Sequence, residues 1–297
     1  MKVVRLSSTQ NQSRVKVTLD SGTEYELWLE ANVPLNSSSD CWLFLLLPAC
    51  MKLNEDLELN GTVSSTAVAA FYKAQEELLI AHPHLNKISL KHEGAFQGQQ
   101  SVSSRTIGSF FSGGLDSTYT ATTVTEIQTL VGIWGFDISL KNEKHWNLSK
   151  ELLEKYSKQT GKDLILVKTN IRELSNGLLS WGADYHGTAL SGVANSLSNH
   201  LKKVYISATH TEETKRRSRN KWQSFFNSRS SFLQSSRRTT YCSSAPKQNL
   251  TQIRRSFPGT TKILLKNNWI FLLWRSGLYI HSNNSDRNSD TGWNLGF

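Results

Sequence analysis

The most informative stretch of the chain reads Ile107-Gly108-Ser109-Phe110-Phe111-Ser112-Gly113-Gly114-Leu115-Asp116-Ser117. An apolar run leads into a glycine-rich turn, and we expect a helix to begin near Ser117. A strand, a turn and a helix in this order are typical of a phosphate-binding loop, because backbone amides and the positive end of the helix face the same point. The alternative is a tight strand-to-helix turn without a ligand.

The residue types in the turn suit a bound pyrophosphate. Gly113 and Gly114 have no Cβ, so the backbone can adopt a positive φ and approach oxygen closely. Ser112 and Ser117 offer hydroxyl donors. Asp116 would repel a phosphate unless it holds Mg²⁺ or orients the loop. No Gly-Lys-Ser/Thr follows, as it would in a Walker A loop, and transfer of a γ-phosphoryl group is therefore disfavoured.

Strands and helices alternate between residues 106 and 213. The expected strands are 107–111, 130–136, 164–168 and 204–208, and the expected helices are 117–127, 143–160 and 183–199. This order predicts an α/β fold with a doubly wound parallel sheet, in which ligands bind beyond the carboxyl ends of the strands. The residues expected at those ends are Gly135, Phe136, Asp137, Thr169 and Asn170, with His186 in the opening of the third helix.

The loop matches the pattern Ser-Gly-Gly-x-Asp-Ser and resembles the pyrophosphate loop of the N-type ATP pyrophosphatases. The stretches 135–137, 181–187 and 204–207 follow in an order similar to the 7-cyano-7-deazaguanine synthases, a branch that serves deazapurine biosynthesis. The resemblance covers residues 106–211. It implies an adenine nucleotide alpha hydrolase-like, Rossmann-like fold and a cytoplasmic ATP-dependent ligase. Such a ligase adenylates a small carboxylate, releases pyrophosphate and then forms an amide or a nitrile.

The resemblance also implies roles for individual residues. ATP would be held by Ser112, Gly113, Gly114, Leu115, Asp116, Ser117, Gly135, Phe136, Thr169 and Asn170, and Mg²⁺ by Asp116. Asp116, Asp137 and His186 are the catalytic candidates. The alternative for Asp137 is a helix cap or a turn, and for His186 it is a capping or packing role. A homodimer is compatible with the resemblance.

Residues 1–105 predict a smaller α+β domain that ends in a linker. Alternating segments at 15–19 and 23–29 indicate a hairpin, and an apolar stripe over 65–81 indicates a helix. The linker spans 94–104. His82 and His84 flank a proline, and we expect a loop there rather than a metal site, since no third ligand is near in the sequence.

Basic residues are concentrated in the last third of the chain. The whole chain has 34 Lys+Arg and 24 Asp+Glu, a formal net charge of +10. Residues 214–297 contain 15 of the bases and two acids, Asp286 and Asp290, and so carry +13, while residues 1–213 carry −3. This segment predicts a tail that binds tRNA or another nucleic acid, a poorly ordered extension, or the product of a frameshift after about Thr211.

The zinc site implied by the resemblance is absent. Synthases of that branch continue with a cluster of the form Cys-Gly-x-Cys-x-x-Cys, whereas residues 214–297 contain Cys242 alone. A catalytically impaired nucleotide-binding protein is therefore an alternative. A tRNA sulfur-transferase would need a reactive cysteine near the loop, but Cys41, Cys50 and Cys242 lie outside 106–211. The apolar runs 42–48 and 269–274 are too short for a membrane span, and the polar start of the chain predicts no signal peptide.

Overall fold

The computed structural model describes residues 1–96, 104–207, 238–242, 260–266, 269–274 and 277–282, with the backbone alone for residues 95–96 and for those after 207. The chain forms two compact units, Met1–Ala245 and Pro246–Phe297. A sheet of ten strands lies in the first unit, and a sheet of three strands lies in the second.

The large sheet is mostly parallel. Its strands run in the order β10-β9-β6-β7-β8-β3-β2-β1-β4-β5, and every neighbouring pair from β10 to β8 is parallel. These five strands are β6 (Thr106–Phe110), β7 (Thr129–Trp134), β8 (Asp163–Thr169), β9 (Leu201–Ser207) and β10 (Arg238–Cys242). The chain passes from β6 to β7 and β8 and then returns to β9 on the other side of β6. The order therefore reverses at the carboxyl end of β6, and the predicted α/β architecture with a parallel sheet is confirmed.

The other half of the sheet comes from the start of the chain. Its strands are β1 (Lys2–Arg5), β2 (Gln12–Thr18), β3 (Glu24–Ala31), β4 (Leu57–Ser64) and β5 (Leu90–Phe96). β2 and β3 form the predicted hairpin, and β3 pairs antiparallel with β8 through Leu29 and Thr169. The expected boundary near residue 105 therefore does not interrupt the sheet. Of the expected linker, residues 94–96 belong to β5, and 97–103 lie outside the described residues.

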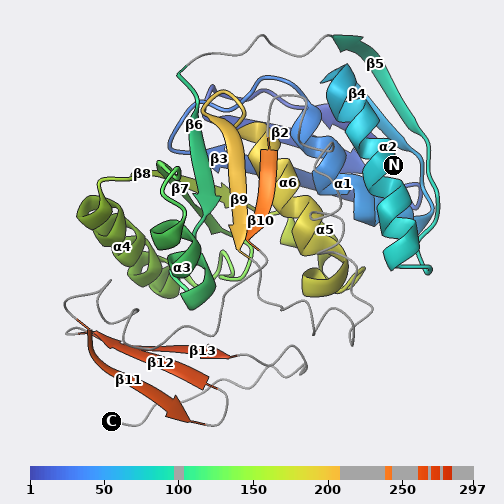
Figure 1. The fold of residues 1–297 in the computed structure, drawn as a ribbon. Coiled ribbons are helices and arrows are strands. Elements are labelled where there is room, and N and C mark those ends of the chain that lie inside the picture. Colours follow the sequence, from blue (N-terminus) through green and yellow to red (C-terminus); the bar gives the residue numbers. More distant parts are fainter. Residues whose placement is uncertain (97–103, 208–237, 243–259, 267–268, 275–276, 283–297) are drawn as a thin grey trace. The chain divides into compact units, whose positions relative to one another are not determined.

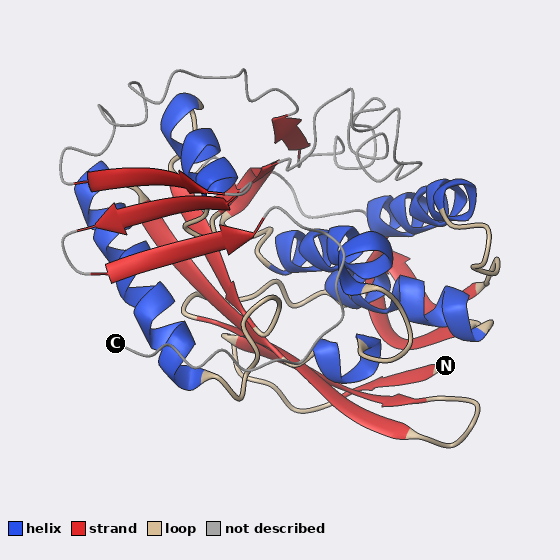
Figure 2. Ribbon diagram, turned by 90° about the horizontal axis from the view of Figure 1, so that it is seen from below, coloured by secondary structure: helices blue, strands red, loops and turns tan. Residues whose placement is uncertain are grey.

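Helices flank the strands, as Figures 1 and 2 show. Helices α3 (Leu115–Thr123) and α4 (Glu143–Thr160) lie on one side of the sheet in Figure 1, and α1 (Asp40–Leu53), α2 (Ser65–Ala81) and α6 (His186–Ser196) lie on the other. Between β8 and α6 the chain forms the short helix α5 (Arg172–Ser175) and a π-helix, η1 (Trp181–Tyr185). The helix expected at 183–199 is therefore divided into η1 and α6.

Local capping explains why two helices match their predicted bounds. The Ser64 hydroxyl accepts the Ala67 amide at the start of α2, and the Asn142 side chain accepts the His145 amide at the start of α4. Gly161 ends α4 with a φ of +66°, in the left-handed region that glycine favours.

Helix α1 is the centre of the core and was not predicted. All residues from Asp40 to Met51 are buried, and the Trp42 indole donates to Ser13 Oγ at 3.0 Å. Helix α6 packs directly on α1, because a Cβ added to Gly192 would lie 2.6 Å from Leu45 Cγ. Among the helices of the described residues, none combines the length and the apolar character needed to cross a membrane.

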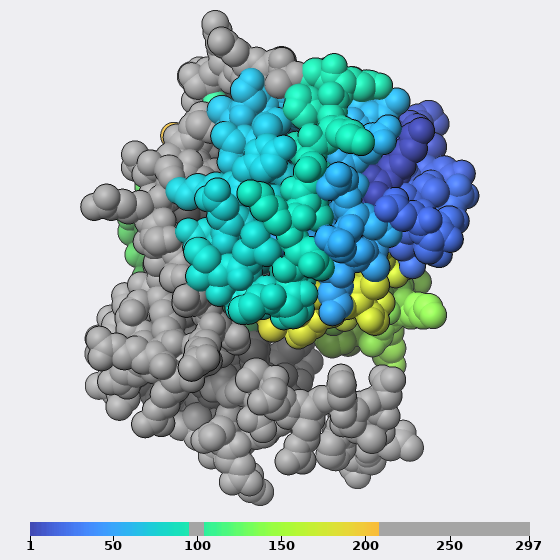
Figure 3. All heavy atoms as spheres, turned by 90° about the vertical axis from the view of Figure 1, so that its right-hand side faces the viewer, coloured from blue at the N-terminus to red at the C-terminus, as the bar shows by residue number. Residues whose placement is uncertain are grey.

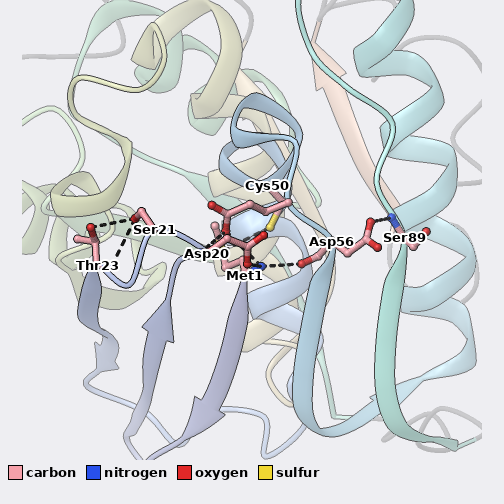
Figure 4. Close-up of polar contacts among 8 residues, drawn as sticks. Met1, Asp20, Ser21, Thr23, Cys50, Asp56 and Ser89 are labelled. Atoms are coloured by element: carbon pink, nitrogen blue, oxygen red, sulfur yellow. Dashed lines mark hydrogen bonds and ion pairs between the residues drawn. The ribbon is translucent and has the colours of Figure 1, made fainter.

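The amino group of Met1 joins three parts of the first unit (Figure 4). It donates to Asp56 O at 2.8 Å and to Asp20 Oδ1 at 3.2 Å, and it lies 3.2 Å from Glu55 Oε2. Burial disfavours its charge, but hydrogen bonds to Glu55 and Asp20 and their negative charges raise the pKa of this amino group overall. These contacts hold the start of β1 against the β2–β3 turn and the loop before β4.

The second unit contains an antiparallel meander of β11 (Thr260–Lys266), β12 (Trp269–Trp274) and β13 (Gly277–Ser282). The apolar run at 269–274 therefore forms a strand. Most of the basic segment, including 214–237 and 243–259, lies outside the described residues.

Candidate functional site

The predicted phosphate loop follows β6 and leads directly into a helix. α3 begins at Leu115, two residues before the expected start. Gly113 has a φ of +77°, and a Cβ there would meet nothing nearer than Leu153 Cδ2 at 3.8 Å. Glycine is therefore needed for the backbone conformation rather than for space. The Phe111 amide donates to Val131 O at 2.8 Å, which fixes the start of the loop against β7.

Two serine hydroxyls shape the loop from within. Ser117 Oγ donates to Gly114 O at 3.0 Å and lies 3.2 Å from Ser112 Oγ. The Gly114 amide donates to Ser112 Oγ at 3.3 Å. Ser117 is buried, whereas Ser112 and Gly113 are exposed. The expected hydroxyl donors are thus engaged with the turn itself.

Three other backbone amides of the loop are not engaged in hydrogen bonds within the described residues. Within the described residues, the amides of Gly113, Leu115 and Ser117 donate to no acceptor of the protein. They lie at or just before the first turn of α3, where the helix dipole favours an anion. The loop therefore offers unengaged donors at the carboxyl edge of the parallel sheet.

A second tight turn follows β7, the neighbour of β6. Gly135 has a φ of +103°, and its amide donates to Ile138 O at 3.1 Å. A Cβ at Gly135 would lie 1.8 Å from Thr169 O, so the ends of β7 and β8 are in direct backbone contact. This turn presents Asp137 on the surface. Asp137 does not cap α4, whose cap is Asn142.

The π-helix brings Trp181 to this turn. The Trp181 indole donates to Asp137 Oδ1 at 3.3 Å, and its ring packs edge-on against Phe136 with centroids 4.8 Å apart. The Arg172 guanidinium lies 4.4 Å from the centre of the Trp181 ring and donates to Phe136 O at 3.3 Å. A carboxylate, a guanidinium and two aromatic rings therefore surround the end of β7.

His186 lies beside the same aromatic rings. Its ring centre is 5.5 Å from that of Trp181 and 5.9 Å from that of Phe136. Burial lowers the pKa of His186; the charge of Asp137 opposes this effect and that of Arg172 adds to it. Burial also lowers the pKa of Arg172, against the attraction of Asp137, although a guanidinium remains charged at neutral pH. The site thus combines a neutral imidazole with a cation.

Thr169 and Asn170 have structural partners in β3. Thr169 Oγ1 donates to Trp28 O at 2.7 Å, and Thr169 is fully buried. Asn170 accepts the Trp28 amide at 2.8 Å and donates to Glu26 O at 2.9 Å. These hydrogen bonds join β8 to β3, and their role in ATP binding stays a prediction.

The structure brings together part of the predicted site and adds two residues. Asp137, Phe136 and His186 form one cluster, and the Ser112–Ser117 loop follows the adjacent strand. Arg172 and Trp181 were not predicted as site residues. Two features of the sequence could have indicated them. Arg172 follows the end of β8 closely in the sequence, and the stretch at 181–186 is rich in aromatic residues.

The described cysteines do not fit the zinc site of the resemblance. Cys41 and Cys50 lie inside α1, and both are buried. Burial raises the pKa of Cys41 to about 12 and also raises that of Cys50, so neither thiol is poised to bind a metal or attack sulfur. Cys242 lies on β10.

The expectation that His82 and His84 have no third ligand is wrong in space. Asp184 of η1 lies beside them, and the ligand atoms of the three residues are all within 4.8 Å of one another.

Comparisons of the chain with protein-family models, curated proteins and solved structures gave no match.

Proposed function

We propose that this protein is an ATP-dependent ligase that adenylates a small carboxylate with release of pyrophosphate, in the manner of the 7-cyano-7-deazaguanine synthases. The observation that supports it most is the group of unengaged amides at Gly113, Leu115 and Ser117. These donors lie where the strand order reverses, the usual ligand position in a doubly wound sheet. The proposal includes the adenine nucleotide alpha hydrolase-like form of that fold.

The loop is suited to hold the leaving pyrophosphate. Its amides and the start of α3 offer positive electrostatic potential without a lysine, which suits binding of a leaving group rather than transfer of the γ-phosphate. Asp116, in the first turn of α3, would supply an oxygen ligand to Mg²⁺. That ion, when bound, neutralises phosphate charge.

The cluster after β7 is suited to the reacting end of the substrates. A carboxylate oxygen attacks the α-phosphorus, and the bond from that phosphorus to the bridging oxygen of pyrophosphate breaks. Arg172 is the cation available to stabilise the negative charge of this step, and Trp181 and Phe136 O hold its guanidinium in place. Ammonia then attacks the acyl carbon, AMP leaves, and neutral His186 accepts the released proton.

Binding of ATP and of inorganic pyrophosphate, measured by calorimetry, tests the loop. Gly113→Ala disturbs a φ of +77° and should weaken both ligands at least tenfold. Gly161→Ala is the matched control, because Gly161 has a φ of +66° with no atom within 4 Å of an added Cβ and ends α4 instead. Equal effects of the two substitutions, or no binding by the unaltered protein, would contradict the assignment of the loop.

Product analysis tests the chemistry. The full chain is incubated with Mg·ATP, ammonium and a panel of small carboxylic acids, and nucleotide and phosphate products are separated. AMP and pyrophosphate, dependent on one of the acids, are expected. ADP and orthophosphate as the sole products would refute the ligase proposal.

A second candidate is a nucleotide-binding protein that does not turn ATP over. The location of Cys41 and Cys50 within the core favours it, because neither can replace the missing cysteine cluster. Tight ATP binding without AMP formation under any substrate would identify this case. The nucleic-acid alternative rests on residues after 213 and stays a prediction; RNA affinity that falls steeply with salt would support it.

A further inference from the structure

Three metal-ligating side chains that the proposed ligase chemistry does not use meet at the end of α2. His82 and His84 follow this helix directly, and Asp184 lies in η1. All three ligand atoms lie within 4.8 Å of one another. We propose that His82, His84 and Asp184 form a binding site for a divalent transition metal of the Zn²⁺ type, with one coordination position left open to solvent.

The two buried members already lie close to ligand spacing. His82 Nδ1 is 2.8 Å from Asp184 Oδ1, and the two side chains are only 7% and 10% exposed. Two ligands on a tetrahedral metal with bonds of about 2.0–2.1 Å are roughly 3.3 Å apart, so a small widening admits the ion. The metal would replace the proton that joins His82 to Asp184, and that proton passes to solvent.

The third member lies at the surface. His84 is exposed, and its ring lies nearly perpendicular to that of His82, with centroids 5.8 Å apart. In Figure 3 the cyan-to-teal part of the chain that includes α2 borders the yellow part that includes η1. His84 therefore places one ligand of the proposed site on the surface.

The carboxylate is oriented by its own element. Asp184 Oδ2 accepts the Ser180 amide at 3.1 Å, which turns Oδ1 toward His82. Outer hydrogen bonds of this kind fix the orientation of metal ligands in known sites.

The donor set selects the kind of metal. Two imidazoles and one carboxylate suit Zn²⁺ and related ions, whereas Mg²⁺ and Ca²⁺ prefer oxygen ligands alone. Three protein ligands leave a position open, as in zinc sites that bind water. Asp184 also lies within a π-helix, a rare element that is frequent at functional sites.

A metal here would join distant parts of the fold. It would link the end of α2 to η1, and η1 also carries Trp181, whose indole donates to Asp137. Occupancy should therefore stabilise the position of Trp181. This site does not depend on the proposed ligase activity, and either can fail without the other.

Calorimetric titration of the full, EDTA-treated chain with Zn²⁺, and the visible spectrum with Co²⁺, test the site. One equivalent of metal should bind, and His84→Ala should weaken that binding at least tenfold. His145→Ala is the control, because His145 is also exposed but lies on α4 outside the cluster. Circular dichroism confirms that both variants are folded.

The outcomes separate clearly. Zn²⁺ binding lost in His84→Ala and kept in His145→Ala supports the site, as does a thermal midpoint that rises with Zn²⁺ only when His84 is present. Zn²⁺ affinity unchanged in His84→Ala, no binding by the unaltered chain, or equal competition by Mg²⁺ would overturn it. Asp184→Asn provides a second variant that keeps the size of the side chain, and it should also weaken binding.

Discussion

Substitution of Gly135 by alanine should be among the most damaging single-methyl changes in this protein. Gly135 has a φ of +103°, and an added Cβ would lie 1.8 Å from Thr169 O. The neighbour is a backbone oxygen, which cannot rotate away as a side chain can. The ends of β7 and β8 would have to separate.

The expected cost has two parts. A side chain at this φ costs about 1–3 kcal/mol in backbone strain, and forcing a methyl group into a filled space costs about 1–3 kcal/mol more. Together they amount to about 2–6 kcal/mol, a large share of the roughly 5–15 kcal/mol that stabilises a typical domain.

Gly22→Ala isolates the strain. Gly22 lies in the β2–β3 turn with a φ of +83°, and no atom lies within 4 Å of an added Cβ. It should lose about 1–2 kcal/mol. Urea unfolding followed by circular dichroism measures both variants. A loss in Gly135→Ala no greater than that in Gly22→Ala would refute the close approach of the two strand ends.

Three other changes test different parts of the first unit. Gly192→Ala should lower the thermal midpoint by an amount equivalent to about 1–3 kcal/mol, because the added Cβ would lie 2.6 Å from Leu45 Cγ. This cost should outweigh the higher helix propensity of alanine. A higher midpoint would contradict the α1–α6 contact. The Cys41 thiol, buried with a pKa raised to about 12, should be labelled by a thiol reagent only after unfolding, which peptide mass analysis detects; rapid labelling of the folded protein would show that α1 is accessible. Hydrogen bonds donated by Lys203 and Tyr205 lower the pKa of Glu126. The carboxylate therefore stabilises the folded protein above its ordinary pKa of 4.5, and this stabilisation is lost as the pH falls below that value. Glu126→Gln should therefore cost less than about 1 kcal/mol at pH 7 and nothing in acid, by urea unfolding at both pH values; equal losses would argue against the ion pair.

The sequence predicted those elements whose signals are local. Helices α2 and α4 have capping side chains and an apolar stripe, and the strands of the parallel sheet are short apolar runs between polar turns. Helix α1 was missed because it is buried on all sides. Its residues from Trp42 to Met51 give no alternation between polar and apolar faces, so no helical period is visible.

The parts of the candidate site that follow strand ends could be predicted from the sequence. Contacts between residues far apart in the sequence could not. The Ser112–Ser117 loop and Asp137 follow strands whose order along the chain implies a common edge. The contact of Asp184 with His82 joins residues far apart in the sequence, and nothing local indicates it. Thr169 and Asn170 were placed correctly at the end of β8, but their partners in β3 depend on a long-range pairing that the hairpin pattern does not reveal.

The pairing of β3 with β8 means that the start of the chain helps to position the candidate site. Trp28 O of β3 accepts the Thr169 hydroxyl, and Thr169 O lies where a Cβ of Gly135 would be. The turn at Gly135 in turn presents Asp137 to Trp181. The contacts from Trp28 to Thr169 and from Thr169 to Gly135 both involve backbone atoms. A shift of β3 would therefore be transmitted to the Asp137 carboxylate. Residues 106–207 therefore share one continuous sheet with the start of the chain. Strand β3 continues the sheet beyond β8, the last strand of the parallel group β10 to β8, and the geometry after β7 depends on this pairing.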